Sequence, residues 1–310
     1  RSNAMDIGAG FDYKIFDWLT FVSNNKVGLS NSYGENYYDP KAVGQESLQG
    51  TIYNSNSNVR TIYTSQLLRF LKTFNDVHEI NAYLGYDYDE YRYYSMTGQA
   101  SQMFQGNEIL NGGVANPKVG GTKVEKKNAA YYFNGNYSYD NKYLFQVMFR
   151  VDGSSQFGSN KRWAPFWSVG GGWSMHKWVN ELKPRISYGI SGNLPGGAYE
   201  WATMLASTTQ YGGKVGLYSN YLGNPDLSWE ETATLDFGLD VRLFDRLSIV
   251  FDYYHKNVKN LIYLKHLPAV TGYNRQTANN GKMTNQGFEV TVTPEIIRTK
   301  DIGICANGQV

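Results

Sequence analysis

The 310-residue chain is poor in cysteine and in net charge. Its single cysteine, Cys305, excludes an internal disulfide framework and any cysteine-based metal site. Its 29 basic and 27 acidic residues leave a net charge of +2, too little for an electrostatic footprint on nucleic acid, so we predict no nucleic-acid partner. No run of about 18 or more apolar residues occurs, and the sequence therefore predicts no transmembrane helix.

Aromatic residues and glycine are abundant. The chain has 26 Tyr, 15 Phe, 7 Trp and 33 Gly beside only 8 Pro, a composition that favours β-structure. The opening Arg1-Ser2-Asn3-Ala4 resembles the remnant of a cleaved expression tag, so we assign residues 1–5 to a tag. We expect residues 6–310 to form one partial barrel domain.

One phrase occurs twice. GFDYKIFDWLTF at Gly10–Phe21 and GLDVRLFDRLSI at Gly238–Ile249 share the order Gly, apolar, Asp, apolar, basic, apolar, Phe-Asp, any residue, Leu, hydroxyl, apolar. In each copy apolar and polar residues alternate before the Phe-Asp break and again after it. Alternation with a period of two on both sides of a short polar break predicts a β-hairpin.

The same logic predicts six hairpins and about twelve strands. Tight turns are expected near positions 17, 76, 141, 178, 245 and 298, and long connections over Ser30–Asn58, Thr97–Lys127 and Leu194–Ser228. Short turns at one end and long loops at the other are typical of an outer-membrane β-barrel, with a polar face toward the lumen and an apolar face toward lipid. A soluble sandwich or propeller shares the alternation, but strands of about 10 residues suit a membrane crossing better.

Four stretches carry a resemblance to a known family. They are VDGSSQFG at Val151–Gly158, LKPRISYGISGN at Leu182–Asn193, NPDLSWE at Asn224–Glu230 and NGKMTNQGFE at Asn280–Glu289. In this order they resemble SusC/RagA-type TonB-linked outer-membrane receptors. The signature residues, which we interpret as structural, are Asp152, Gly153, Ser154, Ser155, Phe157, Gly158, Asn193, Trp229, Glu230, Gly281 and Gly287.

The resemblance implies an antiparallel transmembrane β-barrel of about 22 strands, in the outer membrane of a Gram-negative bacterium of the Bacteroidota type. It also implies an N-terminal plug, a SusD-like surface lipoprotein as a lid, and TonB as the energy source. Neither a plug nor a TonB box is visible in this sequence. We therefore interpret the chain as roughly the middle of a receptor.

Catalysis finds no support in the sequence. Asp152-Gly153-Ser154-Ser155 is interpreted as a strand-end turn, in which glycine and hydroxyl groups satisfy the backbone. The four histidines lack metal-ligand spacing, and Gly189-Ile190-Ser191-Gly192 lacks the second glycine of a nucleophile elbow. We expect no enzyme, no catalytic residue, no metal and no cofactor.

Aromatic residues in predicted loops are the candidates for ligand contact. Trp201, Tyr211, Tyr218 and Tyr221 lie in the long connection after Leu194, and exposed loop aromatics often bind a partner. Such a loop can also pack on itself or on the lid. Tyr91 and Tyr94, near Asp87 and Asp89, suit a sugar, or form the interfacial aromatic girdle of a barrel.

Three functions remain open at this point. The leading hypothesis is import of oligosaccharides by a receptor fragment embedded in outer-membrane lipid. The same fold could instead import a siderophore, cobalamin or a peptide. The third hypothesis, from another class, is a soluble or surface adhesin or lectin-like β-protein.

Overall fold

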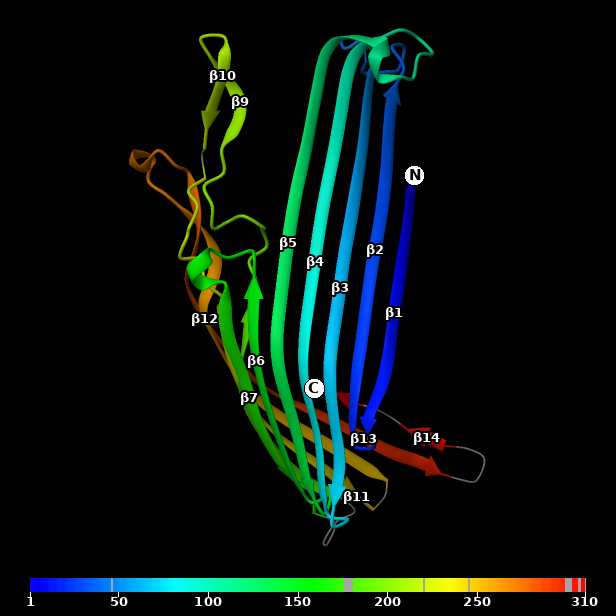
Figure 1. Ribbon diagram of the computed structural model, residues 1–310, viewed down its shortest axis with the longest axis vertical. Helices are drawn as coiled ribbons and strands as arrows, with labels where there is room; N and C mark the ends of the chain where they lie inside the picture. The colour runs from blue at the N-terminus through cyan, green and yellow to red at the C-terminus, as the bar shows by residue number, and fades with distance from the viewer. Residues whose placement is uncertain are drawn as a thin grey trace. The chain divides into compact units, whose positions relative to one another are not determined.

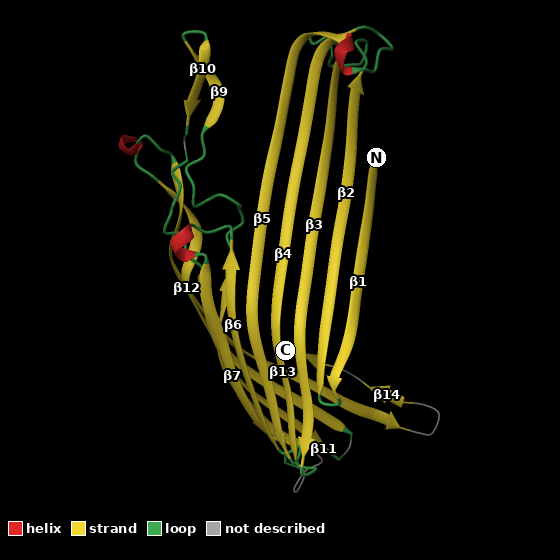
Figure 2. Ribbon diagram, viewed as in Figure 1, coloured by secondary structure: helices red, strands yellow, loops and turns green. Residues whose placement is uncertain are grey.

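The chain is almost entirely β-strand (Figures 1 and 2). The computed structural model describes residues 1–45, 47–175, 181–219, 221–244, 246–298, 303–305 and 308–309. No helix in these ranges is long and apolar enough to cross a membrane.

The strands are longest in the first half of the chain. Their bounds are β1 Ser2–Phe16, β2 Leu19–Tyr38, β3 Thr51–Phe74, β4 His78–Met103, β5 Gly113–Tyr139, β6 Tyr143–Ser154, β7 Trp163–Trp173, β8 Glu181–Asn193, β9 Ala206–Tyr211, β10 Lys214–Tyr218, β11 Glu230–Leu243, β12 Leu247–His266, β13 Arg275–Arg298, β14 Gly303–Cys305 and β15 Gly308–Gln309. Three short 3₁₀ turns lie in the connections: η1 Leu110–Gly112, η2 Ser159–Lys161 and η3 Ala269–Thr271.

The strands pair as a meander. Within the described residues, a 13-stranded sheet runs in the order β1 to β8, then β11 to β14, and β15 pairs with β13. β9 and β10 form a separate antiparallel hairpin. Between β11 and its neighbours the register places Phe237 opposite Tyr253 on β12 and opposite Ile186 on β8. The predicted all-β, antiparallel architecture is confirmed.

The chain divides into two compact units. The first comprises residues 1–11, 23–65 and 87–128, and the second comprises residues 12–22, 66–86 and 129–310. The first unit holds the parts of β1–β5 farther along the chain from the tight turns at 17–18, 75–77 and 140–142, together with the β2–β3 and β4–β5 connections. It has a small core of Ile52, Ala100 and Met103. The second unit holds these three tight turns with the adjoining strand ends, and all strands from β6 onward.

In the second unit one face of the sheet exposes large apolar side chains. On β5, Tyr131 is 57% exposed and Phe133 is 41% exposed, and they alternate with Asn134 and Asn136. Because successive strand residues point to opposite faces, the apolar and polar sets are cleanly separated. The predicted alternation between an apolar face and a polar face is therefore present in the sheet.

The strands of the first unit are longer than the sequence predicted. Much of Ser30–Asn58 and Thr97–Lys127, predicted as long loops, is strand: β2 continues to Tyr38, β4 to Met103, and β5 begins at Gly113. Gly, Asn and Ser there lower β-propensity, but cross-strand pairing with neighbours of similar length extends the ladder. Predicted loop length was therefore wrong for these two connections.

The predicted turns fare better where they are described. Turns occupy positions 17–18, 75–77 and 140–142 as predicted. The turn predicted near 245 is confirmed by its flanks, because Phe244 and Arg246 are turn residues and the Arg246 N–H donates to the Leu243 carbonyl at 3.1 Å. Residues 176–180 and 299–302, and position 245 itself, lie outside the described residues, so the turns predicted near 178 and 298 stay predictions. The β9–β10 hairpin inside Leu194–Ser228 was missed, although Gly212 and Gly213, both with positive φ, mark its turn.

Candidate functional site

A small aromatic core ties together the connections of the second unit. Phe157 and Leu227 are fully buried, and Phe166 and Trp229 complete the cluster. The ring centroids of Phe157 and Trp229 lie 4.9 Å apart, and those of Phe166 and Trp229 lie 5.4 Å apart. Phe157 follows β6 and Leu227 precedes β11, so this loop core joins two connections that are distant in sequence.

Buried polar side chains fix the loop core. Gln156, only 3% exposed, donates from Nε2 to the carbonyl oxygens of Pro195 at 2.7 Å and Gly197 at 3.0 Å. Trp229 donates from Nε1 to the carbonyl oxygen of Arg162 at 3.1 Å. Each bond satisfies a backbone carbonyl that an irregular segment would otherwise leave unpaired.

A second set of bonds links the loop core to the β12–β13 pair. Asn224 donates to the carbonyl oxygen of Thr277 at 3.0 Å. Asn279 accepts from the Ser228 N–H and donates to the Ser228 carbonyl, both at 2.8 Å. The β6–β7 connection, the β8–β11 connection and strand β13 are thus joined through one set of side chains.

The remaining signature residues also have structural surroundings. Arg150 donates from Nε to both carboxylate oxygens of Asp152, at 2.8 and 2.9 Å. Ser154 accepts from the Gln156 N–H at 3.2 Å. Two further signature side chains accept hydrogen bonds from backbone N–H groups: Asn193 from Leu194 and Glu230 from Ile262. The glycines lie against neighbouring side chains: Gly153 under the Trp163 ring, Gly281 beside Leu261 and Gly287 beside Tyr254.

Of the candidate loop aromatics, some pack against neighbouring residues and one is exposed. Trp201 packs against the loop core, and its Nε1 makes no hydrogen bond among the described residues. Tyr221 donates from its hydroxyl to the carbonyl oxygen of Glu200 at 2.8 Å, and burial raises the pKa of this phenol. Tyr218 is 44% exposed, and the side chain of Tyr211 lies outside the described residues.

Tyr91 and Tyr94 point to opposite faces of β4. They are three positions apart on a strand whose side chains alternate. Tyr94 is 48% exposed. Asp89, on the Tyr91 side, accepts from Asn128 at 2.8 Å. The two tyrosines therefore cannot contact one ligand on a single face of the sheet.

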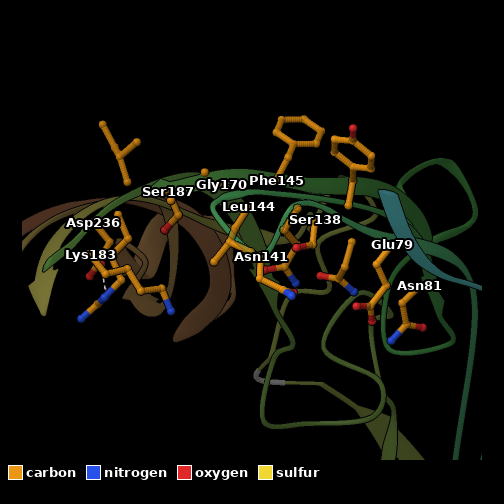
Figure 3. Close-up of a pocket in the computed structure, with 17 residues that line it drawn as sticks. Glu79, Asn81, Ser138, Asn141, Leu144, Phe145, Gly170, Lys183, Ser187 and Asp236 are labelled. Atoms are coloured by element: carbon orange, nitrogen blue, oxygen red, sulfur yellow. Dashed lines mark hydrogen bonds and ion pairs between the residues drawn. The ribbon is translucent and has the colours of Figure 1, made fainter. Parts of the chain in front are cut away.

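The polar face of the second unit contains a hollow of about 520 Å³ (Figure 3). In the close-up, Phe145 points away on one side of the sheet, while Ser138, Asn141 and Ser187 lie on the other side. The polar lining residues are Glu79, Asn81, Asn136, Ser138, Asn141, Gln146, Lys183, Arg185, Ser187 and Asp236. We call this surface the polar wall.

Arg185 organises one end of the polar wall. Its guanidinium lies 2.5 Å from Asp252, 3.4 Å from Asp240 and 3.5 Å from Asp236. The register places Gly238 of β11 opposite both Arg185 on β8 and Asp252 on β12. A Cβ at Gly238 would overlap the guanidinium, so glycine leaves the space through which Arg185 reaches Asp252.

This cluster was not predicted, although part of its signal was visible. Asp236 and Asp240 share a face because they are four apart on a strand. The contact of Arg185 with all three carboxylates depends on strand register across a long connection. Gly238, moreover, is the first residue of the second copy of the repeated phrase.

The polar wall offers groups that form hydrogen bonds and ion pairs. Among the described residues, no cluster of three or more His, Cys, Asp or Glu side chains could hold a metal ion. The polar part of the lining consists of amides, hydroxyls and charged groups, of which Arg185 and Asp236 form an ion pair. These groups are suited to hydrogen bonding with a polar solute or a polar protein surface.

Comparison with known proteins identifies the family. The model of the family described as TonB dependent receptor-like, beta-barrel, matches residues 2–299. The chain belongs to this family. The TonB-dependent receptors with this barrel are outer-membrane proteins, so the apolar face of the sheet is the face toward lipid.

Named relatives agree with this receptor family. TonB-dependent receptor P39 of Formosa agariphila is 30% identical over 315 residues, which cover 94% of this chain and 30% of the relative. TonB-dependent receptor SusC of Bacteroides thetaiotaomicron is 31% identical over 190 residues, covering 56% of this chain and 19% of SusC. The resemblance to SusC/RagA-type receptors is confirmed.

Solved structures share the fold. The RagAB peptide importer in its closed-closed state matches with a TM-score of 0.91 and 23% identity, over 99% of this chain and 35% of that chain. The copper transporter OprC matches with a TM-score of 0.63 and 13% identity, over 95% of this chain and 44% of that chain. The receptor segment described here spans about a third of the length of P39 and of the RagAB chain it matches.

Proposed function

We propose that this receptor segment forms part of the barrel wall of an oligosaccharide importer in the outer membrane of a Bacteroidota-type bacterium. The complete receptor works with a SusD-like surface lipoprotein and draws energy from TonB through its plug. The importer binds and moves its solute without covalent chemistry.

The observation that carries the proposal is the composition of the polar wall. Four of its side chains are amides: Asn81, Asn136, Asn141 and Gln146. An amide both donates and accepts hydrogen bonds, as does a sugar hydroxyl. A wall that carries several uncharged groups of this kind suits a neutral, hydroxyl-rich solute.

A peptide is the second candidate. Arg185 with its three carboxylates, and Lys183 and Glu79 nearby, place both signs of charge on the same wall. A zwitterionic solute would find partners for both its charged ends there. The named peptide importer RagAB has the same fold, which fits this alternative.

The test uses the complete parent gene. A deletion strain is grown on single glycans, on peptides as sole nitrogen source, and under iron or cobalamin limitation. The proposal predicts a growth defect on one glycan class, restored by the full-length gene. A defect confined to peptides would favour the second candidate, and a defect confined to iron or cobalamin limitation would overturn both.

Complementing alleles connect the defect to the polar wall. Gln146→Leu removes an amide from the polar face, and Phe145→Leu changes the adjacent residue on the other face. We expect Gln146→Leu to reduce growth at limiting glycan by several fold and Phe145→Leu to leave it unchanged. Equal growth of the two strains would contradict a role for this face in solute passage.

A further inference from the structure

A charged cluster lies in the first unit, around Glu90 of β4. The Glu90 side chain is 7% exposed, and Oε1 lies 2.9 Å from the Arg60 guanidinium and 2.5 Å from Arg92 Nε. Lys127 Nζ lies 4.0 Å from Oε2, which also accepts from the Tyr88 hydroxyl at 3.0 Å. One covered carboxylate therefore holds three cations in place.

The cations remain open to solvent. The side chains of Arg60, Arg92 and Lys127 are 43%, 41% and 44% exposed, and that of Lys123 is 72% exposed. Glu125 is the second carboxylate, 3.6 Å from Arg92 and 3.9 Å from Lys123. Four cations against two carboxylates leave a surplus of two positive charges on this surface.

The guanidinium group of Arg60 is only partly engaged. Its Nε makes no hydrogen bond among the described residues, whereas Arg92 Nε lies against Glu90 Oε1. Both arginines border a groove of about 670 Å³, also lined by Lys123, Leu29 and Tyr94. The groove thus combines cations with apolar side chains.

Strand periodicity assigns this cluster to the face that meets lipid. On β4, Glu90 and Arg92 lie at even-numbered positions, as do Ile80, Leu84 and Tyr86. No residue of β4 before Gln102 has a left-handed backbone conformation, so the alternation of faces is not interrupted between them. On β5, Lys127 shares the parity of Tyr131 and Phe133, which are exposed and apolar. Side chains at even spacing along a strand point to one face.

The position along the strands matches the lipid headgroups. A tilted strand crosses the hydrocarbon in about 9–11 residues, and counting that number from the turn before His78 ends near Tyr88. Glu90 is the first charged residue on this face of β4 beyond the turn. On β5, Lys127 precedes the aromatic Tyr131 and lies farther from the turn at positions 140–142. It therefore lies immediately beyond the interfacial aromatic girdle.

We propose that this cluster is a site for the phosphate of an outer-leaflet glycolipid headgroup. Arginine forks bind phosphate oxygens in charge-assisted pairs, and basic clusters at the membrane surface bind anionic headgroups. Leu29 and Tyr94, which line the same groove, contact the less polar part of the same lipid. Glu90 fixes the cations before the lipid arrives, which lowers the entropic cost of binding.

The test uses the complete receptor in nanodiscs that contain either bis-phosphorylated lipid A or its dephosphorylated form. Native mass spectrometry measures the lipid retained by the wild type and by the Arg60→Gln/Arg92→Gln/Lys123→Gln variant. We expect the variant to retain at least tenfold less phosphorylated lipid, and both proteins to retain equally little of the dephosphorylated form. Lys126→Gln, one residue from Lys127 on the other face of β5, is the matched control and should retain lipid as the wild type does.

A second variant separates binding from folding. Lys123→Glu changes an exposed residue of the groove that does not contact Glu90. We expect this variant to retain several fold less phosphorylated lipid. Its heat-modifiable migration in gels, which reports barrel folding, should stay normal. Equal retention of both lipids, or equal retention by variant and wild type, would overturn the proposal. So would full competition by soluble glucosamine 1-phosphate, or loss of lid lipoprotein binding with lipid retention unchanged.

Discussion

Gly158 lies directly against the backbone of Pro225. A Cβ at Gly158 would overlap the Pro225 carbonyl oxygen, and a peptide backbone cannot move aside as a flexible side chain can. Gly158 has a φ of −61°, which any residue can adopt. The requirement for glycine here is therefore close approach between two connections rather than backbone conformation.

The first prediction follows from this approach. Gly158→Ala should destabilise the folded receptor by about 1–3 kcal/mol, the usual cost of overpacking. Thermal unfolding of the complete receptor in detergent measures the change. Gly196→Ala is the control, because a Cβ there meets no atom within 4 Å. Equal melting temperatures for the two variants would show that the connection relaxes without cost.

The second prediction concerns the loop core. Phe157 is fully buried, so Phe157→Ala should cost about 3–5 kcal/mol through lost burial and the cavity left behind. Limited proteolysis of the connections should accelerate together with this loss. Phe104→Ala, at a site that is 77% exposed, should change neither measurement. A Phe157→Ala receptor with wild-type stability would contradict a supporting role for this core.

The third prediction couples Gly238 to Arg185. Gly238→Ala should cost about 1–3 kcal/mol because the new methyl group displaces the guanidinium from Asp252. In an Arg185→Ala background the same change should cost little, so the two effects should not add. Gly171→Ala, where the nearest atom to a Cβ is 3.6 Å away, is the control. If the stability losses of the two substitutions added in the double mutant, the contact with Arg185 would not be the reason for glycine at position 238.

The fourth prediction concerns pH. The hydrogen bond from Arg60, helped by Tyr88, Arg92 and Lys127, holds the pKa of Glu90 below its ordinary value against the opposing effect of burial. A carboxyl group with a lowered pKa stabilises the folded state fully above its unfolded pKa of about 4.3. That contribution is lost as pH falls through the lower, folded value.

Unfolding at pH 7 and at decreasing pH measures this contribution. Glu90→Gln should be less stable than the wild type at pH 7, and the difference should shrink as pH falls below about 4.3. Glu108→Gln, at an exposed position of the same unit, is the control. A difference between Glu90→Gln and the wild type that stays constant with pH would contradict the assignment.

The strand order could be predicted from the sequence because its causes are local. Alternation with a period of two identifies the faces, and polar pairs such as Asn75-Asp76 and Asp140-Asn141, all with positive φ, mark the turns. Each turn joins neighbours in an antiparallel meander. Strand length was not predictable in this way, because Gly113–Lys127 is extended by pairing with β4 rather than by its own propensity.

The candidate sites depend on contacts that a single sequence does not specify. Arg185 meets Asp252 only because β8 and β12 flank Gly238 on β11 in register. The signature residues were predictable as a set through the family resemblance. Their mutual contacts in the loop core were not, because Phe157 and Trp229 come from different connections.

The loop core has a consequence for how receptors of this kind diversify. Phe157 and Leu227 belong to two different hairpin connections and pack in one core, and Asn279 of β13 bonds to Ser228 beside that core. A recombination event that replaced one connection alone would introduce a mismatched partner into the shared interior. New specificities are therefore expected to arise by exchange of both connections together with the start of β13, or by point changes at exposed positions such as Tyr218.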